Sequence, residues 1–190
     1  MEGKKVFGTI LGVVALIVIV TSLTYAWYTW QSASDEATGV TFTVQGLTDC
    51  ITSEEAATTT TGSSTLIPVS NKSKGYSKAV KLSSTCSTAA KATFSLALTS
   101  LSTDLIDTSF KYAFVNGAGT TISEGNFGSS KQGDVINLTP TAQDLAANSS
   151  GTYTLYLWID GTEHDGVTPN KMQKQPYSFN LTASVTDNVA

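Results

Sequence analysis

Few side chains of this chain could do chemistry: two cysteines, one histidine and a short acidic turn. Cys50 and Cys86 are the only thiols among 190 residues, and no C-x-x-C spacing indicates a metal site. In an exported protein, an even number of cysteines is typical of disulfide bonding, and an oxidising compartment disfavours the alternative of two buried thiols. We therefore expect a Cys50–Cys86 bond that closes a loop of about 37 residues and contributes about 4 kcal/mol in the chain-entropy model.

The single histidine, His164, leaves little basis for hydrolytic chemistry. An H-E-x-x-H zinc site needs two histidines, so the chain cannot form one. A Ser-His-Asp triad would have to use His164, and no G-x-S-x-G nucleophile elbow accompanies it. His164 lies in the turn DGTEHDG, where a solvated histidine is the expected state. We therefore predict that the protein is not an enzyme and has no cofactor, and a secreted hydrolase is the least favoured interpretation.

The same turn carries three carboxylates, those of Asp160, Glu163 and Asp165. Carboxylate oxygens are hard ligands of the kind that calcium prefers, but their spacing here does not match the EF-hand loop. A calcium ion on these three residues is therefore the less favoured alternative to a solvated acidic turn.

The elements that must position these side chains begin with an apolar N-terminal segment. No residue between Lys5 and Asp35 is charged, and residues 6–23 form an apolar run. The run is longer than most secretory signals and slightly shorter than a full membrane span of about 20 residues. Because lysines precede it and acidic residues follow it, the run predicts that the downstream chain is exported.

The end of this segment leaves two alternatives open. The triplet TYA ending at Ala26 is an acceptable cleavage site, which would make residues 1–26 a signal peptide. Alternatively, residues 6–30 stay in the membrane as an uncleaved helix, with an aromatic belt at the interface. Both alternatives place a domain of residues 39–190 outside the cell or at its surface, after an aromatic segment of residues 27–38. The aromatic residues at its start are Trp27, Tyr28 and Trp30.

Composition argues against nucleic acid as a partner. All eleven basic residues are lysines, and the net charge is −4. Without arginine, the chain lacks the bidentate donors typical of phosphate and base-edge recognition. Charged residues make up 14% of the chain, against a usual value of about 25%, which fits an extracellular β-rich protein.

Apolar residues recur at every second position along most of the domain, a period typical of half-buried strands. The strongest strand predictions are residues 40–44, 92–98, 110–114, 153–159 and 177–185, and shorter ones are residues 66–69, 79–82, 121–123 and 135–138. Turn dipeptides such as Asn116-Gly117 separate them, so we expect about nine strands. The residues expected to face the core are Phe94, Leu96, Tyr112, Phe114, Leu155, Leu157, Phe179 and Leu181.

Two segments depart from this pattern. Residues 141–147, TAQDLAA, predict about two turns of helix. Residues 53–64, SEEAATTTTGSS, predict a flexible loop inside the disulfide ring. Because the apolar face of each strand must be covered, two packed sheets are the simplest arrangement. We predict an all-β, two-sheet antiparallel β-sandwich of jelly-roll character, preceded by the N-terminal hydrophobic helix. An immunoglobulin-like version is less favoured, since no tryptophan lies between Cys50 and Cys86.

Two further patterns have both a functional and a plain interpretation. A lysine cluster could bind a polyanion, but lysines on an edge strand and its turn also prevent unwanted strand pairing, which is the favoured interpretation. The cluster contains Lys72, Lys74, Lys78 and Lys81. N-x-S/T triplets are glycosylation acceptors, although they arise often by chance in a chain rich in Ser and Thr. They stand at Asn71, Asn137, Asn148 and Asn180.

The order of the motifs carries a resemblance. A lysine-flanked apolar leader ends in TYA and is followed by WYTWQS, then by the strand-like segment DEATGVTFTVQGL at residues 35–47. Next comes STLIPVSNKSKGYSKAVKLSSTCSTAAKATFSLALTSL, and GTYTLYLWIDG and PYSFNLTASV look like a closing strand pair. This order resembles the TasA and camelysin family of exported bacterial biofilm-fibre and cell-surface proteins. The two cysteines and the Thr-rich loop depart from the TasA pattern.

The resemblance implies a structural role, as a secreted or surface-displayed subunit of extracellular fibres or biofilm matrix. Cleavage after Ala26 would free an extended segment beginning with Trp27, Tyr28 and Trp30, which could complete the sheet of the next subunit. The expected partner is then a second copy of the chain. The alternative is a monomeric adhesion or ligand-binding sandwich anchored in the membrane through residues 6–30.

Overall fold

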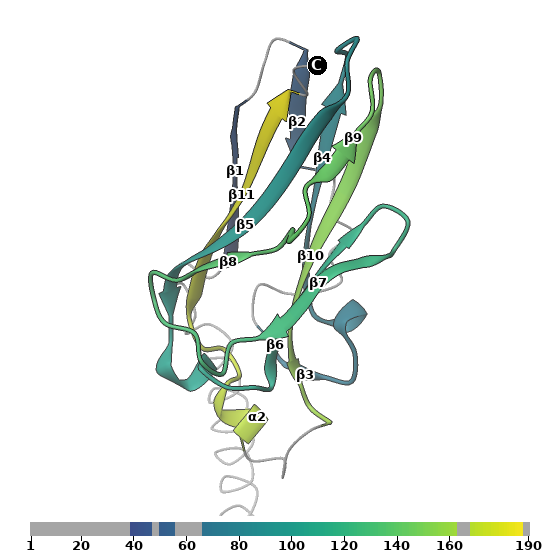
Figure 1. Cartoon of the computed structure of the whole chain (residues 1–190). Helices are drawn as coiled ribbons and strands as arrows, with labels where there is room; N and C mark the ends of the chain where they lie inside the picture. Colours follow the sequence, from purple (N-terminus) through teal and green to yellow (C-terminus); the bar gives the residue numbers. More distant parts are fainter. Residues whose placement is uncertain (1–38, 47–49, 56–65, 163–167, 188–190) are drawn as a thin grey trace, which may run out of the picture. The chain divides into compact units, whose positions relative to one another are not determined.

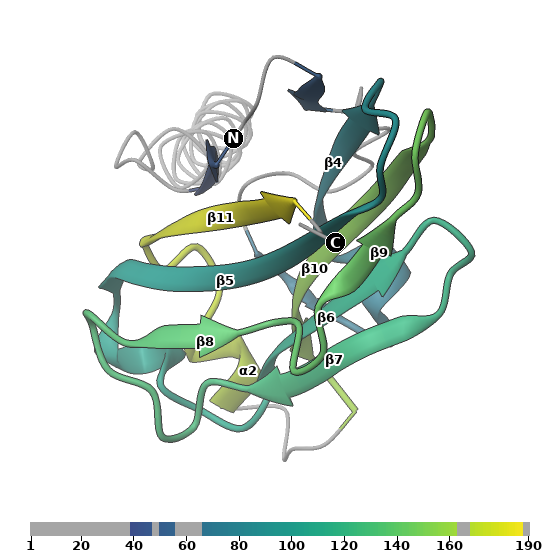
Figure 2. The same ribbon diagram turned by 45° about the horizontal axis from the view of Figure 1, so that its top comes forward.

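Strands with alternating apolar residues form two sheets (Figures 1 and 2). The computed structural model describes residues 39–46, 50–55, 66–162 and 168–187, all within one compact unit of residues 37–190. The predicted signal peptide or anchor, with its helix, and the aromatic segment 27–38 lie outside the described residues.

The first sheet, here called sheet A, contains the first and the last described strands. Its order is β1, β11, β5 and β8, and β9 also pairs with β5. Figure 2 shows β11, β5 and β8 side by side. Every pair is antiparallel except β1 with β11, which is parallel. The bounds are β1 (Gly39–Gln45), β5 (Ala90–Leu101), β8 (Val135–Asn137), β9 (Gln143–Leu145) and β11 (Tyr177–Asp187).

The second sheet, sheet B, has the order β2, β4, β10, β6 and β7, and β3 adds a short parallel pair with β10. Its other pairs are antiparallel. The bounds are β2 (Ile51–Glu55), β3 (Pro68–Val69), β4 (Tyr76–Ser84), β6 (Phe110–Asn116), β7 (Thr121–Asn126) and β10 (Ser150–Asp160). The helical pieces are short: η1 (Lys72–Lys74), η2 (Thr103–Leu105) and α2 (Thr168–Lys171).

The two sheets share one hydrophobic core. The ring of Phe94 on β5 lies 4.9 Å from that of Phe114 on β6 and 4.5 Å from that of Tyr153 on β10. These contacts join sheet A to sheet B, so the arrangement is sandwich-like. Of the eight residues predicted to face inward, seven are buried and Tyr112 is half-buried against the core.

The helix predicted over residues 141–147 is wrong. Part of this segment forms β9, in which Leu145 pairs with Ala90 and Gln143 pairs with Ala92 of β5. Leu145 is only 1% exposed. Its burial against β5 outweighs the weak helix propensity of TAQDLAA, since tertiary context routinely overrides propensity.

The loop predicted over residues 53–64 is wrong at its start, because residues 53–55 belong to β2. Residues 56–65 lie outside the described residues. The segment ITSEE alternates weakly and has one buried apolar residue, Ile51, so its sequence gave little strand signal. With β2 and β9, the described residues form eleven strands instead of the expected nine or so. Two pairs are parallel, so the sheets are antiparallel-rich and not wholly antiparallel.

Candidate functional site

Strand β1 forms one edge of sheet A, and among the described strands it pairs only with β11. In this parallel pair Val40 lies beside Phe179 and Phe42 lies beside Leu181. Val40 is buried, whereas Phe42 and Val44 are only half-buried, although both pack against the core. Parallel pairs are slightly less stable per residue than antiparallel ones. Strand β1 therefore combines a weaker ladder with incomplete burial.

Side-chain hydrogen bonds join the outer face of β1 to β11. The hydroxyl groups of Thr41 and Thr43 lie 3.3 and 3.1 Å from Asn180 Oδ1, to which they donate. Thr41 also donates to the carbonyl oxygen of Phe179 at 3.3 Å. The carboxamide that could carry a glycan at Asn180 thus lies at the seam between the two strands. The other three acceptor triplets, at Asn71, Asn137 and Asn148, present exposed asparagines, and glycosylation of any of the four stays a prediction.

The chain is anchored again shortly after β1. A disulfide joins Cys50 to Cys86, with their Cα atoms 5.0 Å apart, as the sequence predicts. Thr85 donates to the carbonyl oxygen of Cys50 through its backbone N–H at 2.7 Å and its hydroxyl at 3.1 Å. The residue that precedes β2 is therefore held by one covalent bond and two hydrogen bonds.

The lysine cluster does not lie on an edge strand, so the edge-protection interpretation is wrong for β4. Strand β4 lies between β2 and β10 inside sheet B. Lys78 and Lys81 form ion pairs with Glu55 and Glu54 of β2 at 2.7 and 3.8 Å. From η1, Lys72 donates to the Thr121 hydroxyl of β7 at 3.1 Å. These contacts already engage three of the four lysines and weaken the polyanion interpretation.

Several residues singled out in the sequence lie outside the described residues. They are the assembly residues Trp27, Tyr28 and Trp30, the membrane segment 6–30, and Glu163, His164 and Asp165 of the acidic turn. Within the described ranges, no helix is both long and apolar enough to cross a membrane.

Of the expected calcium ligands, only Asp160 is described. Its carboxylate lies 3.0 Å from Lys111 Nζ and accepts hydrogen bonds from the backbone N–H and hydroxyl of Thr162. Burial raises the pKa of Asp160, but the Thr162 hydrogen bonds and the charge of Lys111 together hold that pKa below its ordinary value. Among the described residues no group of three His, Cys, Asp or Glu side chains could hold a metal ion. Calcium binding at this turn therefore stays a prediction that the described residues do not favour.

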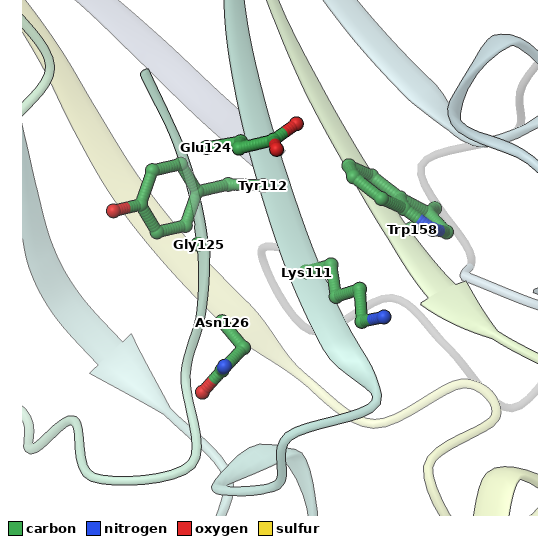
Figure 3. Close-up of a pocket in the computed structure, with 6 residues that line it drawn as sticks. All are labelled: Lys111, Tyr112, Glu124, Gly125, Asn126 and Trp158. Atoms are coloured by element: carbon green, nitrogen blue, oxygen red, sulfur yellow. The ribbon is translucent and has the colours of Figure 1, made fainter. Parts of the chain in front are cut away.

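A pocket of about 250 Å³ opens over β6, β7 and β10 of sheet B (Figure 3). We call it the outer pocket, and it is lined by Lys111, Tyr112, Glu124, Gly125, Asn126 and Trp158. Trp158 lies between Leu157 and Ile159, both fully buried, so its side chain starts from the opposite, outer face of the strand. Sequence analysis missed this pocket, although an outward tryptophan between two core-facing residues was the signal that could have indicated it.

The Lys111 amine and the Glu124 carboxylate both extend over β6 toward the strand that carries Trp158 (Figure 3). In the strand register, Trp158 of β10 lies beside Lys111 of β6, and Lys111 lies beside Asn126 of β7. These three residues therefore form one row across the three strands. A Cβ at Gly125 would overlap the hydroxyl end of the Tyr112 ring, so the absence of a side chain there makes room for this ring.

No protein-family model matches this chain, and no curated protein matches it in sequence.

Proposed function

We propose that this chain is a secreted or surface-displayed structural subunit of extracellular fibres or matrix, which assembles by N-terminal strand addition. The observation that carries the proposal is β1 itself, a parallel, half-buried edge strand that directly follows the aromatic segment 27–38. The Cys50–Cys86 disulfide is consistent with an oxidising extracellular compartment. The jelly-roll character and the resemblance to the TasA and camelysin family are part of the same proposal.

Removing β1 would leave β11 with an unpaired edge next to two large core residues, Phe179 and Leu181. An exposed edge of this kind is a template for an incoming strand, because backbone hydrogen bonds give affinity and side chains fix the register. The β1 strand of a second copy would restore the same pairs. Passing the strand from each copy to the next in a head-to-tail contact builds an open filament.

The disulfide supports such an exchange because it limits which part of the chain has to move. Residues 46–49 connect β1 to Cys50, and the bond to Cys86 holds Cys50 in place. When β1 leaves, β2 and the strands after it can keep their pairs. Four connecting residues span at most about 14 Å, so the neighbouring domain must lie close by.

The test uses cysteine substitutions at a register pair of the β1–β11 ladder, Thr43 and Thr182. Two populations of the full chain, one with Thr43→Cys and one with Thr182→Cys, are mixed before assembly and then oxidised. Strand exchange brings the new cysteines of different chains together, and because each chain carries one of them, a covalent dimer is expected on a non-reducing gel. Assembled fibres that give no covalent dimer would overturn the proposal.

The matched control uses a register pair whose two residues stay in the same chain when β1 is exchanged. Thr93 of β5 and Ser184 of β11 are register partners, and neither belongs to β1. Mixed Thr93→Cys and Ser184→Cys populations are expected to give no cross-link between chains. If the control pair cross-links as fully as the β1 pair, the covalent dimer reflects unspecific contact.

The alternative is a membrane-anchored monomer that binds a ligand through its domain, and the outer pocket is the observation in its favour. N-terminal sequencing of the protein from its host separates the two functions. A start at Trp27 fits the fibre subunit, whereas an intact Met1 fits the anchor.

A further inference from the structure

We propose that the outer pocket binds one ring of a neutral sugar, as a site at which the domain attaches to a polysaccharide. This inference does not depend on fibre assembly, because the pocket is built by β6, β7 and β10 of a single chain. Three properties of the pocket carry it: unpaired polar groups, charge and size.

The first property is a set of polar groups without a protein partner. Within the described ranges, the Trp158 indole N–H and the Glu124 carboxylate make no hydrogen bond or ion pair with the chain. Asn126 uses its side-chain oxygen to accept from the backbone N–H of Gly128 at 3.1 Å, which leaves its amide hydrogens to a ligand. The pocket thus offers a carboxylate acceptor and two kinds of donor, an indole N–H and amide hydrogens. A ring that carries hydroxyl groups can satisfy all of them, because each hydroxyl both donates and accepts.

The second property is the charge of the pocket. Lys111 is neutralised by Asp160 at 3.0 Å, with 22% and 15% of their side chains exposed. Glu124 is exposed and has no such partner among the described residues. An unpaired carboxylate repels phosphate and carboxylate groups but accepts strong, charge-assisted hydrogen bonds from hydroxyl groups. The charge pattern therefore favours a neutral polyhydroxyl ligand over an anionic one.

The third property is the combination of size and surface. A volume of about 250 Å³ lies just below the range of about 300 to 1,000 Å³ for drug-sized ligands, so the pocket suits one ring. The half-buried indole of Trp158 supplies a large apolar side wall, which can cover the C–H face of a sugar ring. Since the pocket opens on the face of a sheet, the rest of a polysaccharide can continue through solvent on either side.

The composition of the chain allows a direct test by fluorescence. Trp158 is one of three tryptophans, and the others, Trp27 and Trp30, precede the domain. In the full chain with Trp27→Phe and Trp30→Phe, all tryptophan emission comes from the outer pocket. The protein is kept in a polyoxyethylene detergent, because a sugar-based detergent would compete. The probes are cellohexaose, maltohexaose and chitohexaose, with choline chloride as a cationic probe.

A saturable change in Trp158 emission is expected with at least one of the three oligosaccharides. Glu124→Gln is expected to weaken that binding about tenfold, since a charge-assisted hydrogen bond becomes a neutral one. Glu54→Gln, which alters an exposed carboxylate of β2, is the matched control and should leave the affinity unchanged.

Three results would overturn the proposal: no saturable change with any of the oligosaccharides, equal affinity in the Glu124→Gln variant, or saturation by choline chloride alone. The last would identify a cation site that uses the indole face. Because the titration uses unassembled protein, it stays informative if the strand-exchange test fails.

Discussion

Leu157 and Trp158 are neighbours on β10 but lie on opposite faces of sheet B. Leu157 is fully buried between the two sheets, whereas Trp158 lines the outer pocket. Core residues and candidate ligand contacts thus alternate along one strand, with the period of two that its backbone imposes. Substitutions at the two positions should therefore separate stability from binding.

Leu157→Ala is expected to lower the free energy of unfolding by about 2 to 5 kcal/mol, because it removes apolar contacts and leaves a cavity. Val135→Ala is the control: Val135 is an apolar strand residue that is 65% exposed, and its truncation should change stability by less than about 0.5 kcal/mol. Urea unfolding of the two variants and the wild type measures both values. A loss below about 1 kcal/mol for Leu157→Ala would contradict the face assignment of β10.

Asp160 should make stability depend on pH. Its pKa is lower in the folded protein than in the unfolded chain, so its contribution is complete above the unfolded pKa and is lost as pH falls through the folded pKa. Asp160→Asn is therefore expected to destabilise the protein by about 1 to 3 kcal/mol at pH 7, and the difference from wild type should disappear in strong acid. Urea unfolding between pH 7 and pH 2 gives this profile.

Asp144→Asn provides the comparison. The Asp144 carboxylate pairs with Lys91 at 2.6 Å but is 75% exposed, so solvent screens the pair. Losing this ion pair should lower the free energy of unfolding by less than about 1 kcal/mol at pH 7. If Asp160→Asn and Asp144→Asn lower the free energy of unfolding equally, the lower exposure of the Lys111–Asp160 pair adds nothing to its strength.

At the scale of elements, strands with strict alternation were predictable and strands held by their neighbours were not. Residues 92–98, 153–159 and 177–185 fall within β5, β10 and β11, since every second residue of these strands is apolar. β9 and β2 each contain one buried apolar residue, so their strand conformation comes from pairing with β5 and β4. Such pairing depends on partners far away in the sequence, which local patterns do not encode.

The candidate sites divide in the same way. The Cys50–Cys86 bond was predictable, because a chain with two cysteines has a single way to pair them. The outer pocket was not, because Lys111, Glu124 and Trp158 come from three strands whose register the sequence leaves undefined. The parallel direction of β1 was likewise hidden, since alternation is the same in parallel and antiparallel strands.

At the scale of the whole molecule, strand exchange alone cannot drive assembly. When β1 of one copy replaces β1 of another, the same seven register pairs with β11 form again, and the net gain in pairing is close to zero. A fibre then needs a contact that the separate domain lacks. The aromatic segment 27–38 precedes β1 directly, so it would travel to the neighbouring copy together with that strand.

Deleting residues 27–34 is therefore expected to abolish fibres and leave a folded, soluble monomer, since every described strand begins at or after Gly39. Electron microscopy shows whether fibres form, and circular dichroism together with size-exclusion chromatography shows whether the domain stays folded and monomeric. Replacing Tyr28 or Trp30 by Asp should weaken assembly less completely, because backbone pairing survives and only the filling of pockets is lost. The deletion variant could instead form fibres like those of the intact protein. In that case β1 exchange needs no aromatic segment, and the drive for assembly would have to come from another surface of the domain.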